Sequence, residues 1–598
     1  MRYFRWIDDI VSVTLVGGLV VLPFFSVSHR MGVFGRQEII FKVLIVCSVF
    51  LVAKSLIWII AGTGRNENAR SSVGAKITIL DLFVAAYLLA GLLNIIFIKH
   101  FEVDRVLFWR WGAVATVYIL VRTIAQKAVI LNALVVAGVA QAAVAMGQRA
   151  GYIASNHPLF DVTGSFGNPG QLGGFLAVTM VIALGLLIGR LKDDNPRIKA
   201  IAVLYILAVV ITGTGLILAD SRAAIVGVVL GLVVLFGGGL LAWLKGKTKR
   251  FLKVAIPAAA VLLIGVAILI FSYRSASADA RLLVWRVTAG LAMQKPIAGH
   301  GVGSFNEQYM TAQAHYFETH PGSPLADVAA NAAYPYNEFL HLLVEQGIVG
   351  LAILVALLWV IFVYKPRNNI QRLVLAGLAA WLTFSLFSYP SYVFALLIPM
   401  MVLIGLAQSR ELYILYIPKW YFGIAVIAFI ILGVKAYEQI DYYRRTAKTM
   451  RILFSKKNEQ AISYIKDNYD KLKHDPAFCG IYAAWLGEKI QNGEDSDADL
   501  ARMITMPPLC ENWCDIGYGY ARRGDYAKSD YYYTTAANMI PTRLRPNYLL
   551  WKMYMAEGDT LAAHRMAQKL LEMPLKVEND FTIGAKAEVR KYLVTVAH

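Results

Sequence analysis

The chain has 598 residues, of which 58% are hydrophobic and only 16% are charged, and its mean hydropathy is +0.55. A soluble globular protein of this length is not so apolar, which excludes a wholly soluble protein and predicts a polytopic membrane protein. The net charge of +19 does not indicate nucleic-acid binding, because Lys and Arg gather in alternate short connections between apolar segments, as membrane topology requires.

A helix needs about 20 mostly apolar residues to cross a bilayer core about 30 Å thick. The first apolar segment follows Arg2 and Arg5 as in a signal peptide, but no small-residue cleavage pattern follows it, so we expect it to be retained as a span. The charge bias predicts a cytoplasmic N-terminus and places a large loop, 274–336, and a C-terminal domain, 440–598, outside the cytoplasm. Thirteen spans are predicted, near residues 8–28, 38–61, 77–98, 106–121, 128–147, 171–189, 200–219, 223–243, 254–273, 337–363, 373–389, 391–408 and 418–438.

The first candidate functional segment is "GSFGNPGQLGGFLAV", residues 164–178, at the start of the sixth predicted span. Glycines and a proline surround Asn168 and Gln171, so the backbone there can come close to a ligand or to another helix. Helix packing with an N-cap is the structural alternative, and the sequence leaves both open.

The second segment is "LADSRAAIVG", in which Asp220, Ser221 and Arg222 interrupt apolar sequence between the seventh and eighth predicted spans. An ionisable residue at the end of a span is costly unless it is paired or used, which makes Arg222 a functional candidate. Arginine is also suited to bidentate recognition of phosphate. An ion pair between Asp220 and Arg222 is the alternative.

The third segment, residues 277–309, lies in the large predicted loop. Arg281 and Arg286 belong to a predicted interfacial helix, and three glycines between 299 and 303 predict a flexible turn. The glycine series is not a dinucleotide fingerprint because no strand precedes it. A loop or lid over a site is expected, although both arginines could instead extend to lipid headgroups.

The stretch "YPYNEFLHLLVEQGIVG", residues 334–350, leads from this loop into the tenth predicted span. It places Tyr336, Asn337 and Glu338 at the mouth of that span, with His320 sixteen residues upstream of Tyr336. These side chains can position a substrate or exchange a proton with it.

Residues 440–598 lose the long apolar runs, and their apolar residues recur at helical spacing. We predict a tetratricopeptide-like helical solenoid of two to four helix pairs, which either braces the membrane domain or binds a protein partner. A disulfide among Cys479, Cys510 and Cys514 is left open. The residues that match the tetratricopeptide pattern are Trp513, Ile516, Gly517, Tyr520, Gly524, Tyr526, Tyr533, Ala536 and Pro541.

Taken together, the segments around Asn168, Ser221 and Arg222, Arg281 with "GHGVGSF", and "YNEFLHLLVEQGIVG" resemble the O-antigen ligase and O-antigen polymerase superfamily. That superfamily includes lipopolysaccharide O-antigen ligases, O-antigen polymerases and bacterial protein O-oligosaccharyltransferases. The likeness covers about residues 150–405 and rests on motif order, topology and the large loop before the tenth span. It implies an all-α fold and a multi-pass protein of the bacterial inner membrane, with its C-terminal domain in the periplasm.

The resemblance implies an inverting C-type glycosyltransferase that needs no metal and no cofactor. Its donor would be a glycan linked to undecaprenyl diphosphate, and an acceptor hydroxyl would attack the anomeric carbon. Arg222 and Arg281 match the superfamily's arginines and, with Arg286, would bind the donor diphosphate as charge develops on it. Asn168, Gln171 and Asp220 would support them.

The superfamily's ligases carry a His-Asn, His-Ser or His-Gln pair, nine variable residues and Gly-x-x-Gly. Here Asn337, Gly347 and Gly350 fit that spacing, but Tyr336 stands at the histidine position. A phenol with a pKa near 10 is a poor base at neutral pH. Glu338 or His320 is the alternative base, and a well-positioned hydroxyl attacking a carbon with a good leaving group can also react without one.

The function predicted is transfer of a lipid-linked oligosaccharide to a hydroxyl outside the cytoplasmic membrane. A protein Ser or Thr is the favoured acceptor, because a helical solenoid typically binds proteins. Ligation to the lipid A core and polymerisation of O-antigen repeat units are the alternatives. A lipid-linked glycan transporter is the alternative from another class, but the polar residues gather at the ends of the spans and not at mid-membrane.

Overall fold

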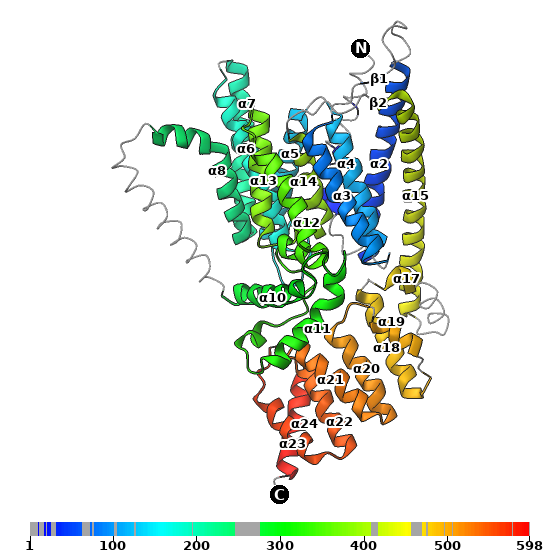
Figure 1. Cartoon of the computed structure of the whole chain (residues 1–598). Coiled ribbons are helices and arrows are strands. Elements are labelled where there is room, and N and C mark those ends of the chain that lie inside the picture. Colours follow the sequence, from blue (N-terminus) through cyan, green and yellow to red (C-terminus); the bar gives the residue numbers. More distant parts are fainter. Residues whose placement is uncertain are drawn as a thin grey trace.

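In the computed structural model the residues that are described are all-α apart from one pair of two-residue strands (Figure 1). The predicted spans near 8–28 and 254–273 lie largely or wholly outside the described residues. A helix occupies each of the other predicted spans. The structure describes residues 10, 17–18, 21–25, 32–61, 72–73, 77–100, 105–124, 127–193, 195–245, 275–407, 417–455, 469–473, 476–494, 497–504, 506–576 and 578–596.

The membrane domain is a bundle of helices that share one buried apolar core (Figure 1). Within the described residues, seven helices are long and apolar enough to cross a membrane: α2, α3, α5, α6, α7, α12 and α15. The bundle consists of η1 (Leu22–Phe25), α2 (Gly32–Ala61), α3 (Ile79–Phe97), α4 (Arg105–Arg122), α5 (Lys127–Arg149), α6 (Pro169–Leu191), α7 (Pro196–Leu218), α8 (Arg222–Lys245), α12 (Glu338–Phe362), α13 (Asn369–Ser385), η4 (Pro390–Tyr392), α14 (Phe394–Leu406) and α15 (Lys419–Ser455), with β1 (Ser72–Val73) paired to β2 (Ile417–Pro418).

Small residues set the distance between the helices that carry the site. A Cβ atom on Gly227 of α8 would lie 2.7 Å from the carbonyl oxygen of Ala380 on α13. A Cβ on Gly231, one turn further along, would lie 3.0 Å from the carbonyl oxygen of Ala376. Membrane helices gain their packing energy from such close approach, because lipid gives little hydrophobic drive to associate. The start of α8 is therefore held firmly against α13.

The loop predicted over residues 274–336 is largely helical and lies between the bundle and the C-terminal domain (Figure 1). It forms α10 (Ser275–Gln294), α11 (Ser304–Thr319) and η3 (Pro324–Val328). One hydrophobic cluster contains residues of this segment, such as Leu283 and Phe305, together with residues of the C-terminal domain, such as Tyr533. The segment and the C-terminal domain thus share a core.

The C-terminal domain is a chain of short helices, each packed on its neighbours. Gly524 and Gly558, thirty-four residues apart, end α20 and α22 in the same left-handed conformation, with φ of 86° and 87°. Cys479, Cys510 and Cys514 are all buried free thiols. The helices are α17 (Tyr469–Leu472), α18 (Pro476–Asn492), α19 (Asp497–Ile504), α20 (Cys510–Arg523), α21 (Tyr526–Met539), α22 (Leu544–Glu557), α23 (Thr560–Glu572) and α24 (Asp580–Val596).

Candidate functional site

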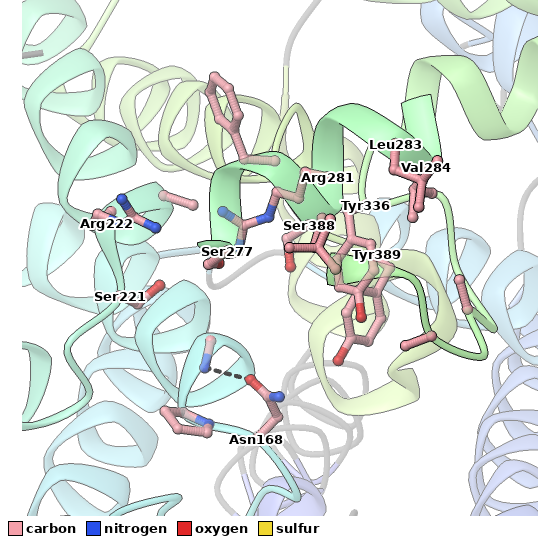
Figure 2. A pocket seen from close by; sticks show the side chains of 18 of the residues that line it. Asn168, Ser221, Arg222, Ser277, Arg281, Leu283, Val284, Tyr336, Ser388 and Tyr389 are labelled. Atoms are coloured by element: carbon pink, nitrogen blue, oxygen red, sulfur yellow. Dashed lines mark hydrogen bonds between the residues drawn. The ribbon is translucent and has the colours of Figure 1, made fainter. Parts of the chain in front are cut away.

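A cavity of about 310 Å³ lies where α6, α8 and α10 meet, at the end of the bundle nearest the C-terminal domain. The loops before α12 and η4 close its other side. Among the residues that line it are Asn168, Asp220, Ser221, Arg222, Ser277, Arg281, Gln313, Asn331, Tyr336, Ser388 and Tyr389 (Figure 2). The segments that the sequence singled out from residue 164 to residue 336 therefore contribute to one cavity.

Arg222 reaches the cavity because the chain breaks between α7 and α8. The break is local: α7 ends at Leu218, Asp220 takes a positive φ of 45°, and α8 begins at Arg222. A non-glycine residue with such a φ is uncommon and marks a sharp turn. The turn places Arg222 in the first turn of α8, facing the cavity together with the buried Ser221 (Figure 2).

Arg281, in the second turn of α10, faces the same cavity from the opposite side (Figure 2). Burial lowers the pKa of Arg281 from its ordinary value, and the positive charge of Arg222 lowers it further. The two guanidinium groups are thus close enough to repel each other in a partly dry space. An anion with several oxygens, bound between them, would remove that repulsion and match the fork geometry of both side chains.

Tyr336 lies beside Arg281, whose Cζ atom is 5.9 Å from the centre of the phenol ring. The ring also meets Tyr389 edge to face at 5.3 Å. Burial raises the pKa of Tyr336 above its usual value, although the charge of Arg281 opposes the shift. The phenol is therefore neutral at neutral pH, so it offers a hydrogen bond and is not a base.

The backbone at Tyr336 is unusual, with a φ of 52°. Such left-handed conformations of non-glycine residues cost about 1–3 kcal/mol and gather at functional sites. Directly after it, the Asn337 side chain accepts hydrogen bonds from the backbone N–H groups of Phe339 and Leu340, both at 3.0 Å, as the N-cap of α12. The turn at Tyr336 thus points its ring into the cavity while Asn337 begins the helix.

Glu338 does not line the cavity but holds one of its walls. Its carboxylate accepts hydrogen bonds from the backbone N–H of Ser391 at 2.7 Å and from the Ser391 hydroxyl at 2.6 Å. His341 lies 3.6 Å from Glu338 and 2.9 Å from Glu345, and its Nε2 is 2.8 Å from the hydroxyl of Tyr392. This partly buried polar group ties α12 to the turn that follows Tyr389.

Three other candidates from the sequence lie outside the cavity lining. Arg286 donates a hydrogen bond to the Tyr316 hydroxyl at 3.2 Å, on an exposed face of the segment. His320 stacks on the same Tyr316 ring at 4.6 Å. Gln171 stands behind the cavity and reaches the hydroxyl of Tyr389 at 3.5 Å. Arg286 and His320 thus form a group of their own.

Glycines allow the backbone of α12 to lie directly against the backbone of the loop between α10 and α11. Gly347 has a φ of 63° inside α12, and a Cβ there would lie 2.2 Å from the carbonyl oxygen of Ile297. The next residue, Ile348, donates a hydrogen bond from its N–H to Pro296 at 2.8 Å, and Gly301 donates to Glu345 at 2.9 Å. Gly347, the first glycine of Gly-x-x-Gly, therefore allows α12 to kink and to form backbone hydrogen bonds with the loop that follows α10.

Asn168 is the N-cap of α6, with its side chain accepting a hydrogen bond from the N–H of Gly170 at 2.7 Å. It also lines the cavity, so the N-cap role is observed and a role toward a ligand stays a prediction.

Sequence reasoning missed several lining residues, among them Gln313, Asn331 and Tyr389. Gln313 is fully buried in α11, and its amide donates to the carbonyl oxygen of Met539 in the C-terminal domain at 2.6 Å. Asn331 donates to Glu511 of that domain at 3.2 Å. No local pattern marks such residues, because their partners lie about two hundred positions away in the chain.

Comparison with known proteins supports the likeness that the motifs gave. Residues 207–355 match the model of the O-antigen ligase family. A Rickettsia typhi protein that carries the provisional name polysaccharide ligase is 24% identical over 213 residues, which are 34% of this chain and 47% of that protein. The chain thus aligns with less than half of that relative's length. The family match includes Arg222, Arg281 and Tyr336.

Proposed function

We propose that this membrane protein is a glycosyltransferase of the O-antigen ligase type, which moves a glycan from a lipid diphosphate to an acceptor hydroxyl. The convergence of Arg222 and Arg281 on one cavity carries the proposal, because two cationic side chains from separate helices, α8 and α10, face the same space and the charge of Arg222 is felt at Arg281. Repelling cations at a membrane boundary suit a diphosphate leaving group. The family match over residues 207–355 supports the same reaction.

In the proposed reaction, the acceptor oxygen attacks the anomeric carbon as the bond from that carbon to the diphosphate oxygen breaks. The electron pair of the broken bond stays on the diphosphate, and the acceptor's proton leaves to water or to a phosphate oxygen. Arg222 and Arg281 stabilise the charge that develops on the leaving group, which accelerates the step because the charge grows in the transition state. Neutral Tyr336 orients the diphosphate or the sugar by a hydrogen bond.

This route needs neither a metal nor a strong base, since positioning and a good leaving group supply most of the rate. We place the cavity on the outer side of the bacterial inner membrane, with the N-terminus in the cytoplasm, as the distribution of Lys and Arg predicts. The donor then carries a polyprenyl chain such as undecaprenol, and the acceptor arrives from the periplasm.

The acceptor is either a protein hydroxyl or a sugar hydroxyl of the lipid A core. The names found in the comparisons, O-antigen ligase and polysaccharide ligase, favour ligation of a polysaccharide and do not point to a protein acceptor. A protein acceptor is supported by the C-terminal domain, which contacts the cavity wall at Gln313 and Asn331 and has a predicted tetratricopeptide-like pattern. A repeat-unit polymerase would use the growing glycan itself.

The test is deletion of the gene followed by complementation with wild type, Arg222→Ala or Arg281→Ala. Both variants should reach the membrane in normal amounts and lose the glycosylated product. Arg590→Ala is the control, because this arginine of α24 is exposed and lies outside the cavity. Wild-type product levels in both cavity variants would refute the diphosphate site. The product that disappears on deletion, whether glycoprotein, capped lipid A core or long polymer, identifies the acceptor.

A further inference from the structure

The connection between α5 and α6 presents large apolar side chains to the surroundings. Leu159 and Tyr152 are 81% and 89% exposed, and Phe160 is 38% exposed. Exposed apolar side chains of this size, gathered on one connection, indicate a surface that something apolar covers. We call residues 152–160 the apolar tip.

The tip is an ordered structure, which separates it from a loop that happens to contain hydrophobic residues. The Ser155 hydroxyl donates to the carbonyl oxygen of Phe160, and the ring of His157 packs against that of Phe160 at 4.7 Å. The backbone N–H of Leu159 donates to His157 Nδ1 at 3.1 Å. His157 and Ser155 therefore fix Leu159 and Phe160 in their exposed positions.

Gln148, in the last turn of α5, anchors the base of the connection. Its Oε1 atom accepts hydrogen bonds from the N–H groups of Thr163 at 2.9 Å and Gly164 at 2.8 Å, and its Nε2 donates to the carbonyl oxygen of Gly164 at 2.8 Å. Gln148 is itself buried. The tip therefore has a fixed place relative to the ends of two membrane helices, at the boundary of the hydrocarbon layer.

The tip is also continuous with the cavity. Phe160 lines the cavity together with Asn168 and Arg222, while part of its surface remains exposed beside Leu159. A side chain that only anchored the protein in lipid would need no contact with a polar cavity. Phe160 instead joins the place where a diphosphate would bind to an apolar surface outside it.

We infer that the apolar tip binds the hydrocarbon chain of the donor, at the isoprene units next to the diphosphate. This inference rests on the proposed function and adds the lipid half of the substrate to it. An isoprenoid chain has methyl branches and no hydrogen-bonding groups, so aliphatic and aromatic side chains are its suitable partners. A chain held by Leu159 and Phe160 would leave the membrane at the mouth of the cavity, with its diphosphate directed to Arg222.

The kinetic test uses the full-length protein in detergent with two donors that carry the same glycan, one on a long polyprenyl diphosphate and one, the short-chain donor, on a methyl diphosphate that has no isoprene unit. Leu159→Ser should raise the KM for the long-chain donor roughly tenfold, since it loses the burial of one large apolar side chain. The KM for the short-chain donor and kcat for both should change little. Leu561→Ser is the matched control, because Leu561 is 65% exposed in the C-terminal domain.

A binding test separates this inference from the proposed reaction. Polyprenyl diphosphate without a glycan, carrying a photoreactive group on an isoprene unit near the diphosphate, should label peptides that contain residues 150–162. Excess unlabelled polyprenyl diphosphate should suppress the labelling, and excess phospholipid should not. The inference is overturned if the label maps elsewhere, if phospholipid competes equally, or if Leu159→Ser affects both donors alike or neither. Labelling of the tip by a protein that transfers no glycan would refute the proposed reaction alone.

Discussion

Arg222 and Arg281 reach the cavity from different parts of the molecule but have the same role in the proposed reaction. Arg222 stands at the start of α8, an apolar helix of the bundle, beside the buried Ser221, whereas Arg281 belongs to the helical segment that rests on the C-terminal domain. Both are directed to one space (Figure 2). Their shared task, in the reaction proposed above, is to accept charge that grows only as the donor bond breaks.

We expect Arg281→Ala to lower kcat by about 10²- to 10³-fold, the usual cost of removing one stabiliser of developing charge. Arg281→Lys should recover only part of this loss, because an ammonium group keeps the charge but cannot bind two phosphate oxygens side by side. Steady-state kinetics with purified donor and acceptor measures both. Full activity of the lysine variant would show that charge alone matters and that geometry does not.

Tyr336 leads to a prediction about pH. Because burial raises its pKa, the phenol stays protonated up to at least its ordinary value near 10, so the rate below that pH should show no ionisation that is due to Tyr336. Tyr336→Phe should lower kcat modestly, about tenfold, through loss of one hydrogen bond to a charged group.

Tyr336→His should introduce a new ionisation. Burial and the neighbouring Arg281 both disfavour an imidazolium, so the inflection should fall below the ordinary histidine value of about 6.5. If the neutral imidazole acts as a base, activity rises with pH through that inflection. The pH–rate profiles of wild type and variant provide the measurement, and identical profiles would count against a position for this residue at the acceptor.

The kink in α12 depends on Gly347, and its substitution tests the junction between helix and loop. Gly347→Ala places a Cβ 2.2 Å from the backbone oxygen of Ile297 and keeps a positive φ that alanine disfavours. We expect a loss of about 2–3 kcal/mol or more in the free energy of unfolding. Gly290→Ala on α10 is the control, because nothing lies within 4 Å of its added Cβ, and it should be neutral or stabilising by up to about 1 kcal/mol. Thermal unfolding in detergent compares the two.

Gln313 joins α11 to the C-terminal domain, so we expect its substitution to destabilise the contact between α11 and α21 and not the membrane helices. Gln313→Ala leaves the carbonyl oxygen of Met539 and the hydroxyl of Tyr309 without this partner, at a cost of about 1–3 kcal/mol for buried polar groups. Hydrogen exchange should increase in α11 and α21 while the membrane helices keep their protection. Gln568→Ala, on an exposed face of α23, should change nothing, and equal exchange in both variants would show that Gln313 does not couple the parts.

The sequence predicted the membrane character, the break before Arg222 and the helical start at Asn337, because each is written in a local pattern of apolar residues, turns and caps. It also predicted an interfacial helix around Arg281, where the structure has α10. The count of thirteen spans, the tetratricopeptide assignment and the roles of the site residues stay predictions. The helix α15 runs through residue 440 without a break, so a change in composition did not coincide with a change in structure there.

What local patterns could not provide is the contact between distant segments. Tyr389, Gln313 and Asn331 reach the cavity because of packing between elements that are dozens to hundreds of residues apart. The three glycines between 299 and 303 predicted a flexible turn, but Gly301 donates a backbone hydrogen bond to Glu345 in α12, a partner that no local pattern reveals. Periodicity identifies an apolar face but not what covers it.

The cluster shared by α10, α11 and the C-terminal domain changes what counts as a module of this protein (Figure 1). An engineer who exchanged residues 456–598 for another domain would leave Phe305, Tyr309 and Phe317 exposed beside the cavity. A chimera that also carries residues 275–336 would keep that core whole. The segments that must be exchanged together are thus separated in sequence by α12, α13, η4, α14 and the long α15, among other residues, and a boundary drawn on the linear chain would divide a single packed unit.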